Sequence, residues 1–379
     1  MFMLSDEKVK AVRLLIVTGE PSGDTLAANL TTEFCKLCSL EIYGTGGPKL
    51  LALGQNQICD VNDMAIIGFD AVICKIPFLL KLANRIEGEV QSVCPDGIIL
   101  VDYAGFNLRL AKRLKKYRIP IICLVAPQVW IWHYSRVKSL AKYFDKVLCI
   151  FPFEEELLRK EGINAVYIGH PVTERLAPKY KNREEFCLAN GINSALPVIG
   201  LLPGSRRKEI EILMPIMTAA ARDWRGKAKY ILAKSDSVKN EMLTPYLKTA
   251  IGITVINGET ADVMRYSDLL WVCSGTATLE AAIIGTPMII LYNSSRFNVI
   301  LAKMLTTLRM IGLPNIIAGR EIMPELLEKR CNAEDLKKTS DLLFENLQEY
   351  RKRLIPIGKM FAGYTPMKTA AEEIFKSIR

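Results

Sequence analysis

The chain has 379 residues, which is too long for one compact core and suits two domains of ordinary size. Half of the residues are apolar and about a quarter are charged, with 24 glycines and 18 prolines, so a disordered, collagen-like or coiled-coil chain is excluded. The net charge of +10 is divided as +2 over residues 1–170 and +8 over residues 171–379, which favours an anionic partner: nucleic acid, an acidic lipid surface or a phosphorylated substrate.

The sequence predicts neither a membrane-spanning helix nor a secretory signal. The longest stretches without a charged side chain contain proline or several polar residues, whereas a spanning helix needs about 20 predominantly apolar residues. The first 15 residues carry five charged side chains and no long apolar core. We therefore expect a cytoplasmic protein.

Short β-branched runs alternate with helical patterns in the first half of the chain, which is typical of a parallel α/β sheet. One predicted helix, residues 107–117, has an apolar face and a basic face. The predicted strands of this half are residues 13–18, 40–43, 97–101, 119–125, 146–151 and 165–168.

The alternation restarts after Gly169–Pro171 and a polar stretch that ends at Arg183. A mainly helical tail is expected from Glu321. The predicted strands of this half are residues 197–202, 228–233, 253–256, 269–273 and 288–292. Two α/β domains joined near residues 170–180 are the simplest interpretation.

Ligands of open parallel sheets lie at the carboxyl ends of strands, so the turns that follow strands are candidate sites. In the turn Gly19–Asp24, two glycines let the backbone approach a ligand and Ser22 can cap the next helix; a plain tight turn is the alternative. Directly after Val101, Asp102 is placed to act as a general base on a hydroxyl, or else to cap the next helix.

Two turns in the second half indicate phosphate binding. The turn Gly204–Arg207 joins backbone donors at a helix start to guanidinium groups, and solvated surface arginines are the alternative. The segment Ser274–Glu280 opens another helix, and its Glu280 can accept hydrogen bonds from a ribose diol. Capping by Ser274 or Thr276 is the alternative there. Two such turns in one domain predict a nucleotide diphosphate.

Other cofactor motifs are incomplete in this sequence. Gly44–Gly47 fails the dinucleotide fingerprint, and no Walker loop is present, which disfavours a dehydrogenase and a P-loop enzyme. Cys35 and Cys38 form the one CxxC pair, with no second pair or histidine pair to complete a zinc site.

Residues 63–85 have apolar side chains at helical spacing with basic residues at the margins. Such a helix can lie in a membrane interface or hold acyl chains, and an ordinary core-facing helix has the same pattern. The candidate acyl-chain or membrane contacts are Phe69, Ile73, Ile76, Leu79 and Leu80.

Eight motifs make the sequence resemble the bacterial lipid A disaccharide synthase family from about Leu15 to Glu321. Each motif is weak alone, whereas their shared order and spacing are specific. They are GEPSGD (19–24), Asp-x-x-x-Phe-Asn (102–107), APQVWIW (126–132), FPFE (151–154), GHP (169–171), LLPGSR (201–206), SGTATLE (274–280) and LPNIIAGRE (313–321).

The resemblance implies the GT-B fold: an α/β architecture of two Rossmann-like parallel-sheet domains that face each other across a cleft, with C-terminal helices crossing back onto the first domain. Residues 1–172 are then the acceptor and acyl-chain domain, joined by a terminal helix at about 360–379. Residues 173–359 are the UDP-sugar domain.

The resemblance also implies an inverting glycosyltransferase that joins UDP-2,3-diacylglucosamine to 2,3-diacylglucosamine 1-phosphate by a β-1,6 linkage and releases UDP. It implies no metal or other cofactor, and no nucleic-acid partner. The enzyme is then expected to be peripheral at the cytoplasmic face of the inner membrane, where lipopolysaccharide precursors are made. A homodimer is a further expectation, because family members can dimerise.

Carried over residue by residue, the resemblance assigns Asp102 as the general base and Arg206 to the UDP phosphates. The other nucleotide-sugar residues are Gly204, Ser205, Ser274, Gly275, Thr276, Glu280 and Asn315. The acceptor-side loops contain Glu20, Ser22, Gly23, Asn107 and Gln128. Two positions depart from the family: Ala104 replaces its usual proline, and His133 stands where an arginine often occurs.

Two alternatives remain at this point. Another UDP-sugar enzyme of the same architecture, an N-acetylglucosaminyltransferase or a UDP-GlcNAc epimerase, would be distinguished by turnover of non-acylated UDP-GlcNAc. A basic nucleic-acid-binding protein would explain the charge but not the Gly/Ser turns after strands. Salt-dependent binding of oligonucleotides without UDP binding would favour it.

Overall fold

The chain folds into two compact units in the computed structural model. The first unit consists of the residues up to Pro171 together with Gly363–Arg379, and the second is Val172–Ala362. The corresponding boundaries predicted from the sequence are 172 and 359. The structure describes residues 11–64, 69–127, 136–193, 195–223, 226–235, 238–248, 252–293 and 310–379.

The first unit contains a parallel sheet of seven strands in the order β3-β2-β1-β4-β5-β6-β7. Six of these strands are predicted by the sequence. The exception is β3, in which polar side chains interrupt the apolar pattern. The strands are β1 (Val12–Thr18), β2 (Leu40–Gly46), β3 (Asn56–Asp60), β4 (Gly97–Val101), β5 (Ile121–Leu124), β6 (Lys146–Cys149) and β7 (Ala165–Tyr167).

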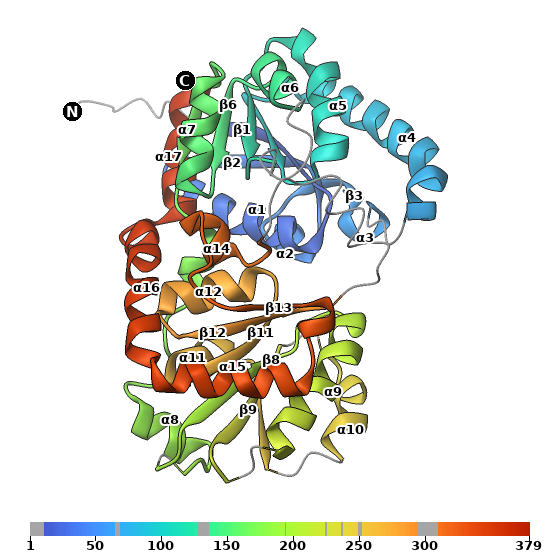
Figure 1. Cartoon of the computed structure of the whole chain (residues 1–379). Helices are drawn as coiled ribbons and strands as arrows, with labels where there is room; N and C mark the ends of the chain where they lie inside the picture. Colours follow the sequence, from blue (N-terminus) through green and yellow to red (C-terminus); the bar gives the residue numbers. More distant parts are fainter. Residues whose placement is uncertain are drawn as a thin grey trace, which may run out of the picture. The chain divides into compact units, whose positions relative to one another are not determined.

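Helices cover both faces of this sheet, as the near-continuous apolar strands require. Because successive strand residues point to opposite faces, Leu15 and Val17 pack with α4, α5 and α6, whereas Leu14 and Ile16 pack with α1 and α17. Figure 1 shows α4 and α5 on one side of this sheet and α17 on the other. The helical segments are α1 (Pro21–Phe34), α2 (Pro48–Ala52), α3 (Val61–Met64), α4 (Phe69–Val93), α5 (Ala104–Leu114), η1 (Lys115–Tyr117), α6 (Arg136–Tyr143), α7 (Pro152–Lys160) and α17 (Pro366–Ile378). The short segment η2 (Pro171–Arg175) leads into the second unit, which begins at Val172.

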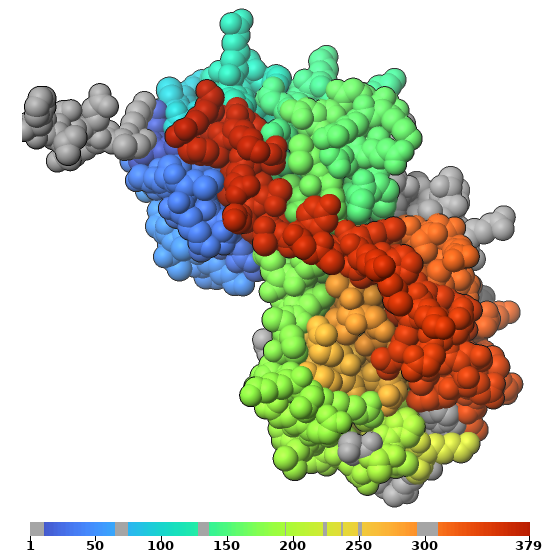
Figure 2. Space-filling model, turned by 90° about the vertical axis from the view of Figure 1, so that its left-hand side faces the viewer, coloured from blue at the N-terminus to red at the C-terminus, as the bar shows by residue number. Residues whose placement is uncertain are grey.

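The last helix, α17, belongs to the first unit although the second unit precedes it in the chain. Met367 and Ile374 are buried beside Phe34 of α1. Glu373 pairs with Lys146 at the start of β6, with 2.8 Å between Oε2 and Nζ. Figure 2 shows α17 in red, flanked by the blue N-terminal segments and the green segments of this unit. The return of the C-terminus to the first domain, implied by the resemblance, is therefore present.

The second unit contains a parallel sheet of six strands in the order β10-β9-β8-β11-β12-β13. The sequence predicts all of them except β13, which lies in the tail expected to be mainly helical. The strands are β8 (Val198–Leu202), β9 (Lys229–Lys234), β10 (Ile253–Asn257), β11 (Leu269–Cys273), β12 (Met288–Tyr292) and β13 (Glu325–Leu327).

Helices also cover both faces of the second sheet. Ile199 and Leu201 pack with α9, α10 and α15, whereas Val198 packs with α8 and α11. Helices α12 and α16 contact each other. The helical segments are α8 (Arg183–Ala189), α9 (Arg207–Asp223), α10 (Asn240–Leu247), α11 (Thr260–Tyr266), α12 (Thr276–Ile284), α14 (Leu313–Ala318), η3 (Glu328–Arg330), α15 (Ala333–Glu345) and α16 (Leu347–Phe361).

Asp24, the last residue of the GEPSGD motif, joins α1 to the start of α2. Its buried carboxylate accepts hydrogen bonds from the backbone N–H groups of Gly47 (2.7 Å), Leu50 (3.2 Å) and Lys49 (3.1 Å). These are donors that a helix start leaves without intrahelical partners.

Replacing Asp24 with alanine is expected to lower the free energy of unfolding by about 3 kcal/mol, because buried N–H donors lose their acceptor. Chemical denaturation measures this. Asp24→Asn keeps one acceptor oxygen and should cost less. The exposed Asp63 provides a matched control, and Asp63→Ala is expected to stay within about 0.5 kcal/mol. Equal losses in the two alanine variants would contradict this role of Asp24.

Candidate functional site

The first two candidate turns lie side by side at the carboxyl edge of the first sheet. Strands β1 and β4 are neighbours, with Thr18 opposite Val101, so the turns that follow them meet. Gly19 lies directly against the ring of Tyr103: a Cβ added to the glycine would be 2.5 Å from the Tyr103 Cδ1. A side chain at position 19 would therefore displace the Asp102 turn.

Asp102 and Tyr103 both adopt left-handed backbone conformations, with φ of 46° and 47°. Asn107 holds this turn, since its Nδ2 donates to the carbonyl oxygens of Val101 (3.2 Å) and Asp102 (2.6 Å). The Asp102 N–H donates to the Leu124 carbonyl at 3.0 Å. Left-handed non-glycine residues are strained and persist where their surroundings fix them, often at functional sites. Asn107 is thus a support of the turn, buried within it.

Asp102 as a whole residue is exposed at the surface of the unit, although the surrounding protein removes part of the water around its carboxyl group. It does not cap α5, because the residue before this helix is Tyr103 and no side chain caps it. Loss of hydration raises the pKa of Asp102, and a hydrogen bond from the Tyr103 backbone N–H opposes that rise. A carboxylate with a raised pKa is a stronger base, which suits proton abstraction from a hydroxyl.

The acceptor-side residues of the first turn lie at the beginning of α1. Glu20 and Ser22 are exposed, and Gly23 is buried. The prediction that Ser22 caps the helix is wrong: α1 begins at Pro21, so Ser22 already lies inside its first turn. Burial raises the pKa of Tyr103, and the nearby negative charge of Glu20 adds to this. The first and second turns therefore form one surface.

Two predicted positions lie outside the described residues. They are Gln128, assigned to the acceptor side, and His133, one of the two departures from the family pattern. The other departure, Ala104, is described and is the first residue of α5.

The second unit contains a pocket of about 760 Å³ at the carboxyl edge of its sheet. Strands β8 and β11 are neighbours, with Leu202 opposite Val272, so the turns that follow them open on the same side. This volume is in the range of small-ligand sites. Seven of the eight predicted nucleotide-sugar residues line the pocket: Gly204, Ser205, Arg206, Ser274, Gly275, Thr276 and Glu280.

Glu209 organises the turn Gly204–Arg207, the first of the two predicted phosphate turns. Its Oε2 accepts hydrogen bonds from the backbone N–H groups of Ser205 (3.0 Å) and Arg206 (3.1 Å), and its Oε1 lies 3.2 Å from the Arg206 guanidinium. The backbone donors predicted to hold an anion are therefore already occupied by a carboxylate. The Arg206 side chain is 85% exposed and remains available to a ligand in the pocket.

The second predicted phosphate turn, Ser274–Glu280, places the start of α12 in the pocket wall. Gly275 precedes the helix with a φ of 153°, and no side chain caps it. The Ser274 hydroxyl instead donates to the Ile311 carbonyl at 3.1 Å. The alternative of capping by Ser274 or Thr276 is thus wrong. The first N–H groups of a helix have no intrahelical partner, so those of Thr276 and Ala277 can serve an anion.

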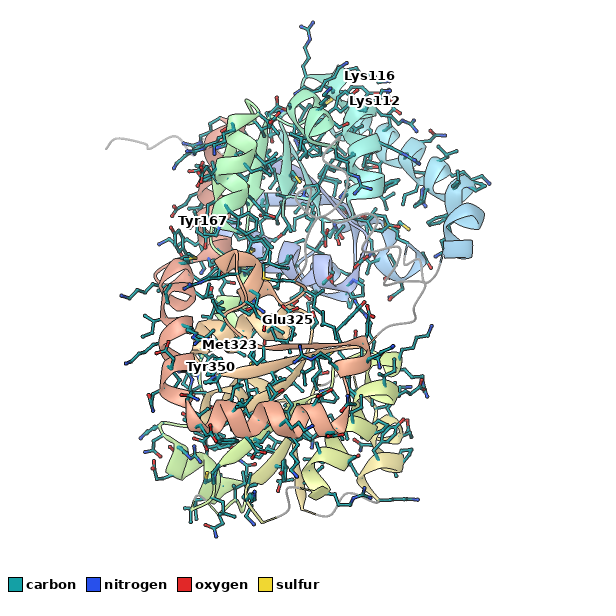
Figure 3. All side chains as sticks on the ribbon, in the orientation of Figure 1. Lys112, Lys116, Tyr167, Met323, Glu325 and Tyr350 are labelled. Carbon is teal, nitrogen blue, oxygen red and sulfur yellow. The ribbon has the colours of Figure 1, made fainter. Side chains whose placement is uncertain are left out.

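Asn315, the eighth predicted residue, is fully buried and does not line the pocket. Its amide nitrogen donates to the Met323 carbonyl and the Glu325 carboxylate, both at 2.8 Å. Figure 3 labels Met323 and Glu325. Glu325 also accepts hydrogen bonds from the backbone N–H groups of Ile311 (3.0 Å) and Gly312 (2.9 Å). Because Ile311 in turn accepts from Ser274, Asn315 supports the pocket wall through Glu325. The sequence analysis missed Glu325, which lies in the short strand β13.

Glu280 lies in the pocket wall with only 9% of its surface exposed, and it forms an ion pair with Arg175. Arg175 also lines the pocket. No motif singles out Arg175, which the sequence places in an ordinary polar stretch.

The predicted acyl-chain residues lie on α4, a 25-residue helix with Pro77 inside. Ile76 and Leu80 are 41% and 57% exposed. Leu79 packs against the core of the first unit, as the core-facing alternative requires. The side chains of Phe69 and Ile73 lie outside the described residues. Within the described ranges, no helix is long and apolar enough to cross a bilayer.

Comparison with known proteins identifies the family. A family model described as lipid-A-disaccharide synthetase matches residues 14–378. The chain belongs to this family. The chain is 35% identical to the lipid-A-disaccharide synthase of Syntrophus aciditrophicus, over 85% of each chain. It is 33% identical to that of Solibacter usitatus, over 93% of this chain and 94% of the relative.

As a member of the lipid-A-disaccharide synthase family, the protein is a glycosyltransferase of lipid A disaccharide synthesis, and its substrates are lipid A precursor sugars. Solved structures share the GT-B fold at low identity. The calicheamicin glycosyltransferase CalG4 superposes with a TM-score of 0.66 at 12% identity, over 97% of this chain and 98% of that one. The Neisseria meningitidis UDP-GlcNAc 2-epimerase bound to UDP-GlcNAc gives 0.60 at 12%, over 97% and 99%.

Proposed function

We propose that this glycosyltransferase transfers 2,3-diacylglucosamine from its UDP derivative to the 6-hydroxyl of 2,3-diacylglucosamine 1-phosphate, with inversion at the anomeric carbon. The assignment of the second unit as the binding site of the UDP-sugar donor rests on its pocket. It combines a guanidinium group, an uncapped helix start and a carboxylate, which are complementary to a diphosphate and a ribose diol. The UDP-GlcNAc epimerases, the alternative considered above, resemble this chain in fold alone.

On the donor side, the leaving diphosphate carries the charge that must be stabilised. When the bond between the anomeric carbon and the diphosphate oxygen breaks, the electron pair goes to UDP. Arg206 and the N–H groups at the start of α12 are hydrogen-bond donors that line the pocket. We propose that these groups carry out the stabilisation and that no metal is needed.

On the acceptor side, the attacking hydroxyl must lose its proton as the new glycosidic bond forms. We assign this proton to the Asp102 carboxylate, whose raised pKa makes it a stronger base than an ordinary aspartate. The strained turn held by Asn107 fixes where the carboxylate stands. The neighbouring start of α1, with Glu20 and Ser22, forms the rest of the proposed acceptor surface.

We further propose that the first unit binds the cytoplasmic face of the inner membrane. On α4, the exposed side chains of Ile76 and Leu80 stand next to exposed Lys81. Lys112 adds an exposed positive charge on the neighbouring helix α5, whereas Lys116 of η1 forms an ion pair with Glu87 of α4 (Figure 3). Apolar side chains with basic margins suit an anionic lipid interface. A homodimer stays a prediction, which analytical ultracentrifugation tests.

Replacing Ile76 and Leu80 together with serine is expected to raise the apparent Michaelis constant for acylated substrates about tenfold, because apolar area that receives acyl chains or lipid is lost. UDP affinity should stay unchanged. Leu342 of α15 provides a matched control, with 59% exposure in the second unit. Leu342→Ser should leave the Michaelis constant unaltered, and an equal rise in both variants would contradict the membrane role of α4.

The proposed reaction is tested by incubating the full chain with the two acylated substrates and detecting the disaccharide 1-phosphate and UDP by mass spectrometry. We expect product without added divalent metal, including in the presence of a chelator. Non-acylated UDP-GlcNAc serves as the comparison donor. If the protein turned over UDP-GlcNAc but not the two acylated substrates, this proposal would be wrong and another UDP-sugar reaction would be indicated.

A further inference from the structure

The ion pair between Arg175 and Glu280 lies in the pocket of the second unit and is not explained by phosphate binding alone. Arg175 is the last residue of η2, and Glu280 lies about one turn inside α12. Both residues line the pocket. Their side chains differ in exposure, at 64% for Arg175 and 12% for Glu280. A nearly buried carboxylate therefore depends on a cation that reaches it from the surface.

Arg175 is the one partner of the Glu280 carboxylate among the described residues. Its Nη2 donates to Oε1. A buried carboxylate without a partner carries a large desolvation cost, so this contact both offsets the charge of Glu280 and selects the orientation of its side chain. The second oxygen, Oε2, keeps its capacity to accept hydrogen bonds, and Glu280 lines the pocket. A carboxylate held in this way matches a pair of vicinal hydroxyl groups.

We propose that Arg175 is a positioning residue that holds Glu280 ready to accept hydrogen bonds from the ribose diol of the nucleotide. The pair makes the pocket discriminate a nucleotide that has both hydroxyls from one that lacks them. This inference rests on the proposed nucleotide site and adds to it the determinant of ribose recognition. Arg175 acts through Glu280, in contrast to Arg206, whose partner is the diphosphate.

A direct contact between Arg175 and the phosphates is the competing role, and it predicts a different dependence on the ligand. A guanidinium that contacts phosphate contributes equally whether or not the sugar carries hydroxyls. A guanidinium that orients Glu280 contributes only when a diol is present. Comparing UDP with 2′,3′-dideoxy-UDP separates the two roles.

The test measures dissociation constants of both nucleotides by isothermal titration calorimetry with the full chain. In the unsubstituted protein, UDP should bind more tightly than dideoxy-UDP. Arg175→Met, which keeps an unbranched apolar stem but removes the guanidinium group, should weaken UDP binding about tenfold and change the dissociation constant of dideoxy-UDP less than about twofold. Arg175→Lys should recover part of the UDP affinity, because a cation again reaches Glu280.

Lys179 offers a matched control for the loss of one positive charge. It lines the same pocket and is 62% exposed, yet it pairs with Glu259 instead of Glu280. Lys179→Met should change the dissociation constants of both nucleotides by the same small factor. The double variant Arg175→Met with Glu280→Gln should bind UDP no more weakly than Glu280→Gln alone, since the two residues act as one unit.

Two results would overturn the positioning role. One is an equal loss for UDP and dideoxy-UDP in Arg175→Met, which would make Arg175 a phosphate contact. The other is unchanged binding of both nucleotides in that variant. The failure of the proposed function has a separate signature, because the unsubstituted chain would then bind neither nucleotide, and this inference would fall with it.

Discussion

Replacement of Asp102 by asparagine is expected to lower kcat about 10³-fold, because the acceptor hydroxyl would lose the proposed base that takes its proton. The substitution keeps the size of the side chain, and the turn depends on backbone groups and on Asn107, so the fold should persist. The dissociation constant for UDP should stay within about twofold, since the proposed nucleotide contacts lie in the second unit. Steady-state kinetics and calorimetry measure the two quantities.

The dependence of the rate on pH gives a second readout of the same residue. A general base works in its ionised form, so kcat/KM should fall as the pH drops through the pKa of Asp102. Because burial raises that pKa, the fall should begin at a pH above the ordinary aspartate value of about 3.9. The residual activity of Asp102→Asn should lack this acid limb.

Asp60, which ends β3 at the same edge of the sheet, supplies the matched control. Asp60→Asn should retain both the rate and the acid limb. Full activity in Asp102→Asn, or an unchanged acid limb in its residual activity, would remove Asp102 from the chemistry. A loss of UDP binding in parallel with the rate would instead indicate a disturbed fold.

The strands and the turns at their ends could be predicted from the sequence because both depend on local patterns. Buried parallel strands are continuous apolar runs, and parallel pairing brings their carboxyl ends to one edge, so the turns after β8 and β11 had to meet. Strands β3 and β13 were not predicted, because their local patterns are not continuous apolar runs. Each is short and carries polar or charged side chains, such as the buried Glu325, whose role appears only in tertiary contacts.

The contacts of the individual site residues could not be predicted from the sequence, because they depend on which hydrogen-bond partner the tertiary structure places beside each polar group. The spacing of Arg206 and Glu209 is compatible with a capped helix start. It does not indicate that Glu209 accepts the hydrogen bonds of the backbone N–H groups that were predicted to bind an anion. Asn315 lies in a family motif, yet its amide is used entirely inside the protein. Arg175 meets Glu280 across 105 residues of sequence, a pairing that no local pattern encodes.

In the turn Gly204–Arg207, the backbone N–H groups of Ser205 and Arg206 already donate to Glu209. The proposed phosphate contact of this turn therefore depends on the Arg206 side chain. Arg206→Ala is therefore expected to weaken UDP binding about 30-fold, the loss of a charge-assisted contact to phosphate. UMP binding should weaken less, because it offers fewer phosphate oxygens. Arg206→Lys should recover only part of the affinity, since an ammonium group cannot form the two parallel hydrogen bonds of a guanidinium.

The adjacent Arg207 separates this contact from general attraction between a basic surface and an anionic ligand. Arg207 is 68% exposed, pairs with Glu211 and does not line the pocket. Arg207→Ala should change UDP affinity less than about twofold, and the change should vanish at high salt, where exposed charges are screened. Equal effects of the two alanine substitutions would reduce the role of Arg206 to surface charge. The diphosphate would then have to be held by the start of α12, where Thr276 and Ala277 present the remaining donors.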